Sequence, residues 1–224
     1  MNNLNKILAS IAFLFSLVIY IWTMAPTTSF WDCGEFIATS VIMGVPHPPG
    51  TPFYLLLGNF FSQLPTFSDI GARVNLISPI FSAFAVMFLY LIIVQLIEEW
   101  YGKVKSWPDC LIIYGSALIG ALTFAFTDSH WFNAVEAEVY SLSTFFTSIV
   151  VWLILKWSSN SGHSGNVRYI LIIAYMLGLA IGIHLLNLLA LPFIALIVYF
   201  NKYQFKLSTF VVTMGITLLT FMVI

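Results

Sequence analysis

Two carboxylates lie close together near the start of the chain. Asp32 and Glu35 are three residues apart in the segment Trp31-Asp32-Cys33-Gly34-Glu35, a spacing that places both side chains on one face of a helix. The segment directly follows an apolar run. Desolvation there raises the pKa of a carboxyl group, which suits a general base or acid. In the structural alternative, Asp32 only caps the helix and Glu35 faces water.

Two basic residues follow. His47 lies between Pro46 and Pro48, which leave it little conformational freedom, and a rigidly placed histidine can bind a ligand or move a proton. Its ring could equally lie in solvent within a turn. Arg73, at the start of a later apolar run, could hold a phosphate group through paired hydrogen bonds. Alternatively, Arg73 extends along a membrane interface to reach water.

Further candidates come later in the chain. Glu136 and Glu138 are two residues apart and cannot share a helix face, so we expect only Glu138, which is nearer the next apolar run, to reach the same cavity as Asp32. Favourable charge at a helix N-terminus also explains such an acid. His184 and Asn187 lie at the end of an apolar run. An interhelical hydrogen bond explains this pair as well as a substrate contact does.

The elements that position these residues are membrane helices. Apolar residues make up 60% of the 224 residues and charged residues 8%, whereas a soluble domain carries roughly 25% charged residues. The composition predicts an all-α polytopic membrane protein with about seven transmembrane helices, each near ~20 apolar residues. The expected spans are Ile7 to Met24, Ala72 to Ile97, Cys110 to Phe126, Val139 to Trp157, Tyr169 to Ile183, Leu185 to Phe200, and Leu207 onward.

The distribution of cations predicts the orientation. Lysine and arginine are enriched in cytoplasmic loops. With a cytoplasmic amino terminus, only Arg73 lies outside, and the cytoplasmic cations are Lys6, Lys103, Lys105, Lys156, Arg168, Lys202 and Lys206. The external acids and histidines are then Asp32, Glu35, Asp69, Asp128, Glu136, Glu138, His47, His130 and His184. Their concentration on one membrane face predicts a reaction site there.

The first external loop, residues 26–71, is too apolar to be an ordinary soluble loop. We expect a short helix over Asp32 to Met43, a proline-rich turn, and a second helix over Pro52 to Leu64 with Thr51 as its N-cap. The second helix would be only about 20 Å long. It should therefore lie in the interface or be buried by other helices.

The whole chain, residues 1–224, is expected to be one transmembrane domain. Because it stops inside an apolar run, we expect it to be the N-terminal part of a longer protein. The absence of a visible eukaryotic retention signal favours a bacterial inner membrane with the loop in the periplasm; in a eukaryote the loop would face the lumen of the endoplasmic reticulum.

Several function classes lack their signatures. No basic block could follow a nucleic-acid backbone, so nucleic acid is excluded as a partner. The zinc motif HExxH, the phosphate loop GxxxxGK, the GxSxG elbow and paired CxxC motifs are all absent from the sequence. No cofactor or metal is expected to be required, although the acids and histidines leave a divalent ion open.

Four motifs resemble those of a known family. They are Trp31-Asp32-Cys33-Gly34-Glu35, His47-Pro48-Pro49-Gly50-Thr51-Pro52-Phe53-Tyr54, Ala137-Glu138-Val139-Tyr140 and Gly182-Ile183-His184-Leu185-Leu186-Asn187. Together they resemble the protein O-mannosyltransferase-like family, a branch of the GT-C membrane glycosyltransferases. The resemblance implies a GT-C-like fold with interfacial helices in the first external loop. It also implies transfer of a mannose-like sugar from a polyprenyl or dolichyl phosphate donor.

The resemblance implies roles for individual residues. Asp32 would deprotonate an acceptor hydroxyl, with Glu35 supporting it, and the hydroxyl would attack the anomeric carbon with inversion of configuration. His47 and Arg73 would contact the leaving phosphate. The remaining substrate-binding residues would be Glu138, Tyr140, His184 and Asn187. The acceptor would be a serine or threonine of a protein, or a glycan, and the site would also contact membrane lipid.

Two other functions stay open from sequence. A transporter or flippase of lipid-linked substrates needs broken helices near the bilayer midplane, for which the Gly178 to Gly182 region is the only mild candidate. A non-catalytic membrane subunit would use the external acids only for topology and solubility. Replacing Asp32 by Asn distinguishes these alternatives, because only an enzyme would lose turnover.

Overall fold

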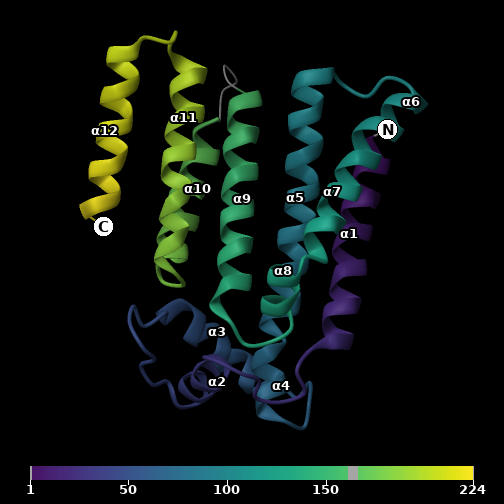
Figure 1. Cartoon of the computed structure of the whole chain (residues 1–224), viewed down its shortest axis with the longest axis vertical. Helices are drawn as coiled ribbons and strands as arrows, with labels where there is room; N and C mark the ends of the chain where they lie inside the picture. Colours follow the sequence, from purple (N-terminus) through teal and green to yellow (C-terminus); the bar gives the residue numbers. More distant parts are fainter. Residues whose placement is uncertain (1, 161–165, 224) are drawn as a thin grey trace.

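The chain forms a bundle of helices that run up and down between two ends (Figure 1). The computed structural model describes residues 2–160 and 166–223, and within these ranges every regular element is a helix. The long elements are α1 (Asn2–Thr23), α5 (Ile77–Tyr101), α7 (Ser116–Ala125), α9 (Val139–Ser159), α10 (Val167–Ile181), α11 (Ala190–Lys202) and α12 (Leu207–Val223). The predicted all-α fold is confirmed for the described residues.

Short elements complete the two ends. At one end lie α2 (Cys33–Ile42), α3 (Pro52–Ser62), α4 (Ile70–Asn75) and α8 (Asp128–Ala134), and at the other lies α6 (Trp107–Cys110). The π-helical turn η1 (Leu111–Gly115) joins α6 to α7, and the 3₁₀ segment η2 (Leu185–Leu189) leads into α11. The sequence did not predict α8, which lies between the expected spans Cys110 to Phe126 and Val139 to Trp157.

Five helical stretches of the described chain are long and apolar enough to cross a membrane, so the chain is an integral membrane protein. They are Asn3–Thr23, Ile70–Tyr101, Trp107–Ala125, Val139–Ser159 and Leu185–Lys202. The other two expected spans are shorter: α10 has 15 residues and α12 has 17. At ~1.5 Å per residue, α10 is only about 22 Å long, less than the ~30 Å hydrocarbon core.

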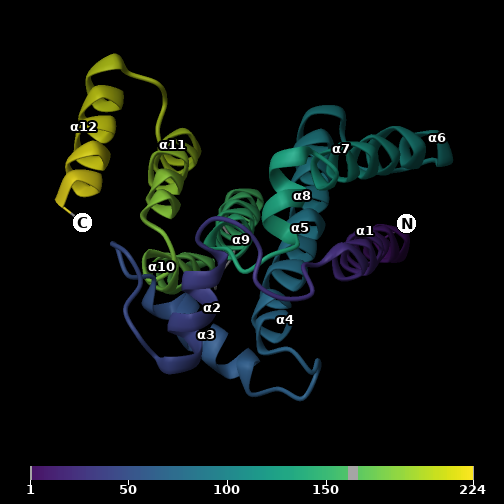
Figure 2. The same ribbon diagram turned by 60° about the horizontal axis from the view of Figure 1, so that its bottom comes forward.

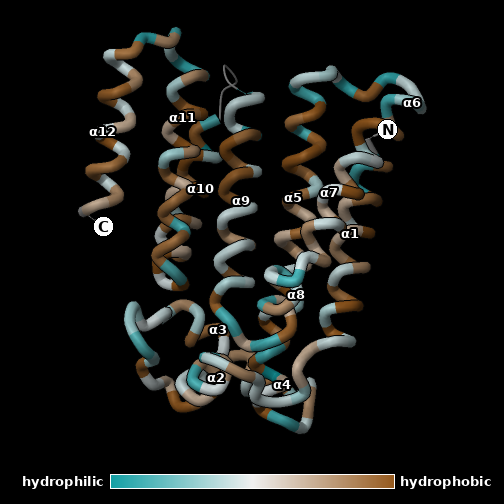
Figure 3. The backbone as a smooth tube through the Cα atoms, viewed as in Figure 1, coloured by the Kyte–Doolittle hydropathy of each residue, from teal (hydrophilic) through white to brown (hydrophobic). Residues whose placement is uncertain are grey.

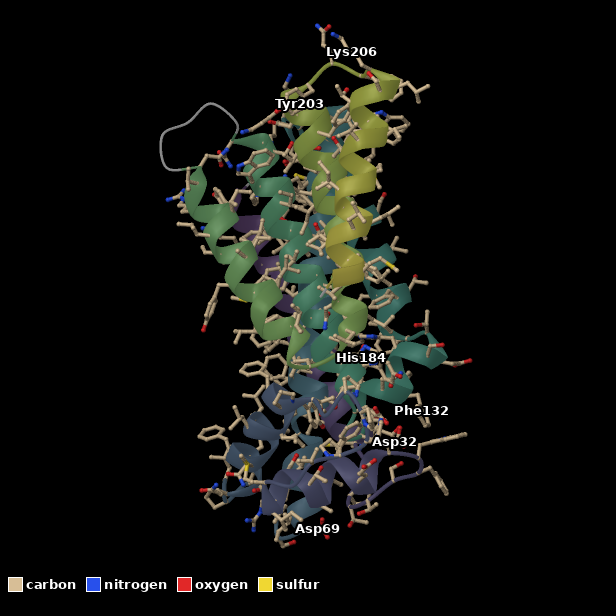
Figure 4. The ribbon with its side chains drawn as sticks, turned by 90° about the vertical axis from the view of Figure 1, so that its left-hand side faces the viewer. Asp32, Asp69, Phe132, His184, Tyr203 and Lys206 are labelled. Carbon is tan, nitrogen blue, oxygen red and sulfur yellow. The ribbon has the colours of Figure 1, made fainter. Side chains whose placement is uncertain are left out.

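Polar residues gather at the two ends of the bundle, and the middle is largely apolar (Figure 3). Asp69 and Asp32 lie at the end formed by α2–α4, whereas Tyr203 and Lys206 lie at the opposite end (Figure 4). The chain therefore separates the acidic loops from the carboxyl-terminal cations in the way the sequence predicted. We call the end that carries α2–α4 and α8 the acidic end.

A buried apolar cluster fixes the short helices beneath the long ones. Phe36 of α2 and Tyr54 of α3 are almost fully buried and pack with Leu142 of α9 and Ile183 after α10. The backbone N–H of Phe53 also donates to the Gly182 carbonyl at 2.8 Å. Figure 2 shows α2 and α3 covering this end of α9 and α10. The first external loop is thus part of the folded bundle.

Close approach of α2 and α3 requires a glycine. A Cβ atom placed on Gly58 would lie 2.1 Å from the Ser40 hydroxyl oxygen, far inside van der Waals contact. The α3 helix has 11 residues, about 17 Å at ~1.5 Å per residue, and is too short to cross the bilayer, as predicted. Thr51 occupies the expected N-cap position, but its backbone is left-handed and its hydroxyl makes no capping hydrogen bond, so capping by this side chain is a wrong prediction.

Candidate active site

The proline-rich turn folds back onto the first turn of α2. The backbone N–H of His47 donates to Glu35 Oε1 at 2.7 Å, and His47 Nδ1 lies 2.7 Å from Glu35 Oε2. A hydrogen bond of 3.0 Å from the Gly50 N–H to the His47 carbonyl closes the turn, and Gly50 has the positive φ of 90° that glycine adopts without strain. Asp32, Glu35 and His47, which are separate in sequence, therefore meet at the acidic end.

The Glu35–His47 pair is an ion pair at the surface. The hydrogen bonds from His47 lower the pKa of the Glu35 carboxyl, and the hydrogen bond to Glu35 raises the pKa of the His47 ring. Both shifts favour the charged forms at neutral pH. Glu35 is therefore a partner of His47 in this structure, and Asp32 is the carboxylate that stays available for other contacts.

Asp32 precedes α2 and is exposed. It occupies the N-cap position, yet its side chain makes no capping hydrogen bond, and no other hydrogen bond of its carboxylate occurs within the described residues. The preceding Trp31 has a φ of 58°, a left-handed backbone that is uncommon for a bulky residue. The structure thus presents Asp32 at the surface of the acidic end without the capping role that was its structural alternative.

Glu136 and Glu138 lie just before α9, and both are buried, with 2% and 6% of their surface exposed. Burial raises the pKa of the Glu138 carboxyl to about 7, and the nearby charges of Asp32 and Glu136 act in the same direction. A pKa near neutral is the range in which a carboxyl group can accept or donate a proton. Glu138 is therefore close enough to Asp32 to respond to its charge, and its part in a shared reaction site stays a prediction.

Asn75, at the end of α4, connects the two acidic segments. Its Nδ2 donates to the carbonyls of Ala25 and Thr27, at 2.8 and 2.9 Å, and its Oδ1 accepts from the Ala137 N–H at 3.0 Å. Sequence reasoning did not identify this residue. The sequence offered one signal for it: Asn75 is a polar residue inside an apolar helical run. A polar side chain buried at such a position normally has hydrogen-bond partners.

His184 and Tyr140 form an aromatic wall toward the membrane. Their ring centroids are 5.3 Å apart, and His184 Nδ1 accepts a hydrogen bond of 3.1 Å from the Leu186 N–H. The neutral ring therefore carries its proton on Nε2, which is free to donate. Burial lowers the pKa of His184, which favours this neutral form. Figure 4 shows His184 above Asp32 on the same edge, with Phe132 between them.

Asn187 uses its amide within the bundle. Its Oδ1 accepts from the hydroxyls of Ser143 and Thr147, at 3.0 and 3.1 Å, and its Nδ2 donates to the carbonyls of Ala180 and His184, at 3.0 and 2.9 Å. These bonds tie α9 to the turn between α10 and η2. The geometry fits the interhelical alternative, in which Asn187 positions His184 and does not itself contact substrate.

Arg73 is engaged elsewhere. Its guanidinium donates to three backbone carbonyls: Phe67 at 2.6 Å, Ser62 at 3.2 Å and Ser68 at 3.5 Å. These carbonyls belong to the end of α3 and the loop that follows it. The described contacts of Arg73 therefore stabilise this loop, and none of them is with the other candidate site residues.

A groove runs along the membrane side of the site. Its volume is about 330 Å³, and it lies between α9 and the η2–α11 segment. Its polar wall is Ser143, Thr144 and Thr147, and its apolar wall includes Leu186, Leu189 and Phe193. The groove begins one helical turn beyond Tyr140 and continues toward the middle of the bundle. It could hold an elongated apolar group next to the acidic site.

The same cluster offers ligands for a cation. Asp32, Glu35 and His47 each contribute one ligand atom, and these atoms lie within 4.8 Å of one another. Oxygen and imidazole ligands of this kind could hold a divalent ion. However, Glu35 and His47 already satisfy each other through their short hydrogen bond, so the arrangement is complete without an ion.

Comparisons with known proteins place this geometry in context. Residues 32–207 match the family described as the N-terminal domain of Protein O-mannosyl-transferase TMEM260. The chain is 26% identical over 155 residues to Protein O-mannosyl-transferase tmem260 of Dictyostelium discoideum. This alignment covers 68% of this chain and 17% of the relative. The chain is also 26% identical over 175 residues to Protein O-mannosyl-transferase TMEM260 of Mus musculus. That alignment covers 78% of this chain and 22% of the relative.

The matched region is thus about a fifth of the length of these curated relatives. No solved structure matches the chain. The matched residues begin at Asp32 and include the acidic site, Asn75 and η2.

Proposed function

We propose that this chain, which belongs to the family of the Protein O-mannosyl-transferase TMEM260 N-terminal domain, forms the catalytic end of a GT-C-type glycosyltransferase. The family resemblance predicted from sequence is confirmed, and the names of the relatives support the proposal of a glycosyltransferase activity. We assign to the acidic end the transfer of a mannose-like sugar from a polyprenyl or dolichyl phosphate to a protein hydroxyl.

Asp32 is the general base of the proposed reaction. Its exposed carboxylate takes the proton of an acceptor serine or threonine hydroxyl as the hydroxyl oxygen bonds to the anomeric carbon. The bond from that carbon to the lipid phosphate breaks, and the phosphate leaves with the electron pair. Attack from the face opposite the phosphate inverts the configuration, as in inverting glycosidases. The observation that carries this proposal is the meeting of Asp32, Glu35, His47 and Glu138 at one end of a membrane bundle.

Two histidines face the departing phosphate and the sugar. His47, held as a cation by Glu35, neutralises developing negative charge on the phosphate. His184 stays neutral and donates from Nε2 to an oxygen of the sugar or phosphate, beside the ring of Tyr140. Glu138 holds a hydroxyl of the sugar or the acceptor. Arg73 has no part in this proposal, because its guanidinium is bonded to the α3–α4 loop.

The groove between α9 and η2–α11 holds the first isoprene units of the donor. Its apolar wall suits a hydrocarbon chain, and the hydroxyls of Ser143 and Thr147 in the opposite wall already donate to Asn187. A donor that arrives through the membrane also fits the proposed sidedness, since nucleotide sugars are not available outside the cytoplasm. We place the acidic end in the periplasm of a bacterium or, in a eukaryote, in the lumen of the endoplasmic reticulum.

An in-vitro transfer assay tests the proposal. The protein is reconstituted into liposomes with a set of polyprenyl-phosphate sugars and a serine- or threonine-containing acceptor peptide. We expect transfer of one sugar, with inversion observed by NMR of the product. Absence of transfer with every donor would overturn the proposal and favour a transporter.

Sidedness is tested independently. A cysteine introduced at Ala38, an exposed position one turn after Glu35, should react with a membrane-impermeant maleimide only from the extracytoplasmic side. Labelling from the cytosolic side alone would contradict the placement of the site.

A further inference from the structure

Asn75 is the buried polar residue on which the two acidic segments converge. It is 0% exposed, and both ends of its amide are hydrogen-bonded. In addition to the bonds with Ala25, Thr27 and Ala137, its Oδ1 accepts a weak hydrogen bond from the Cys33 thiol at 3.6 Å. These partners come from two segments that are far apart in sequence, residues 25–33 and the segment that precedes α9.

Each partner is adjacent to a group of the proposed site. Cys33 follows Asp32 directly, and Ala137 lies between Glu136 and Glu138. Consecutive Cα atoms are about 3.8 Å apart, so a residue next to a hydrogen-bonded neighbour has little freedom to move. The Asn75 amide therefore fixes both the segment that carries Asp32 and the segment that carries Glu138.

A force is needed to hold these segments together. Burial raises the pKa of the Glu138 carboxyl, and the charges of Asp32 and Glu136 raise it further, because like charges in a partly apolar site repel. Asn75 opposes this repulsion with an uncharged amide that donates and accepts at the same time. Leucine has a similar size but neither function, and aspartate of the same shape keeps only the acceptor.

We propose that Asn75 is a positioning residue that fixes Asp32 relative to Glu138 and so sets the geometry in which the acceptor hydroxyl is deprotonated. This inference rests on the proposed function for its catalytic part. Its geometric part, the restraint on the two segments, is independent of any activity.

The geometric part is tested by distance measurement. Nitroxide labels are attached to cysteines that replace Phe30 and Phe132, which are 78% and 48% exposed and lie near Asp32 and Glu138 respectively. We expect a narrow distance distribution in the parent protein and a longer, broader one after Asn75→Leu. The matched control is Asn59→Ala, which removes the bonds from Asn59 to the Ser40 and Val41 carbonyls between α3 and α2 and should leave the distribution unchanged.

The catalytic part is tested by kinetics. Asn75→Asp retains the acceptor for the Ala137 N–H, so it should disturb the fold less than Asn75→Leu. We expect Asn75→Asp to lower kcat at least tenfold while the donor KM changes less than twofold, and Asn59→Ala to change neither. A merely structural residue would instead lower the amount of active protein and leave its kcat unchanged.

A pH profile separates the two roles further. The titratable groups whose charges act on Glu138 or respond to it are Asp32, Glu136, His47, Cys33 and Tyr54. Release of Glu138 from Asp32 by Asn75→Leu should move the midpoint of the kcat profile toward lower pH. A wild-type protein that transfers no sugar overturns the proposed function and the catalytic role of Asn75 together. Unchanged distances, or an unchanged kcat in both Asn75 variants of an active protein, overturn the role of Asn75 alone.

Discussion

The acids at the two ends of the bundle differ in how their charges are satisfied. At the end opposite the acidic end, which the proposed function places on the cytoplasmic side, Glu98 pairs with Lys103 at 2.6 Å, and Glu99 accepts from Ser159 at 2.8 Å. Asp109 accepts from the N–H groups of Lys105 and Ser106, at 3.0 and 2.9 Å, in a capping box that starts α6. Each of these acids therefore has a structural role.

The acidic end has a different pattern. Asp69 caps α4 and Glu35 pairs with His47, but Asp32 makes no side-chain hydrogen bond within the described chain, and Glu136 Oε1 is buried without a partner there. Buried polar groups normally have partners. Asp32 is exposed instead, and it is the acid that the proposed function uses as general base.

The largest effect is expected for the exposed acid. Asp32→Asn should lower the rate of sugar transfer about 10² to 10⁴-fold, the usual contribution of a general base, with folding unchanged because Asp32 holds no structural bond. The matched change at the other end, Asp109→Asn, should keep activity within about twofold and cost about 1 kcal/mol of stability through the weakened cap. Equal losses of activity in the two variants would contradict the proposal that only the acidic end takes part in the reaction.

A smaller effect is expected for Glu138→Gln. The folded-state pKa of about 7 exceeds the ordinary value of a glutamate, so Glu138 lowers the stability of the fold as pH rises from about 4.5 through 7. Glutamine removes this loss. We expect the variant to unfold at a higher temperature than wild type at pH 8 and at a similar temperature at pH 4.5, with kcat reduced about tenfold.

Thermal unfolding in detergent at the two pH values measures this effect. Glu99→Gln, at the other end, should show no such gain at pH 8, because the Glu99 carboxylate is hydrogen-bonded to Ser159. A Glu138→Gln protein that is less stable than wild type at pH 8 would show that the buried, ionised Glu138 carboxylate does not destabilise the fold.

The third prediction concerns the pair of Glu35 and His47. The pKa of His47 is raised, so the ion pair is complete below about pH 6.5, the ordinary histidine value, and is lost as pH rises through the raised value. Donor KM should therefore increase toward alkaline pH. His47→Gln should raise donor KM about tenfold at neutral pH and flatten this part of the pH profile. A variant that keeps the wild-type pH dependence would show that another group titrates.

The smallest effect is expected at the cytoplasmic surface. The Lys103 side chain is 76% exposed in its pair with Glu98, and exposed pairs contribute about 0 to 1 kcal/mol. Glu98→Gln should change stability by less than about 0.5 kcal/mol and leave sugar transfer unchanged, as measured by thermal unfolding and the transfer assay. A large loss of transfer would mean that the cytoplasmic end also takes part in the reaction.

The amino-acid sequence by itself determined the membrane character, the separation of charge between the ends and the positions of the short helices α2 and α3. These features depend on local properties: the length of apolar runs, the asymmetry of lysine and arginine, and prolines that end helices. The same local signals placed the span Tyr169 to Ile183 two residues later than α10, which runs from Val167 to Ile181. These signals also could not show that the Asn187 side-chain amide makes all of its described hydrogen bonds with groups inside the bundle.

Only the tertiary structure decided which polar groups meet. Asn75 and Ala137 are 62 residues apart, and Asn75 and Ala25 are 50 apart. The fold also joined Glu35 to His47, and it bonded the Arg73 guanidinium to carbonyls at the end of α3 and in the loop that follows. Hydrogen bonds of this kind depend on where helices place their ends in three dimensions, and neither composition nor spacing along the chain carries that information.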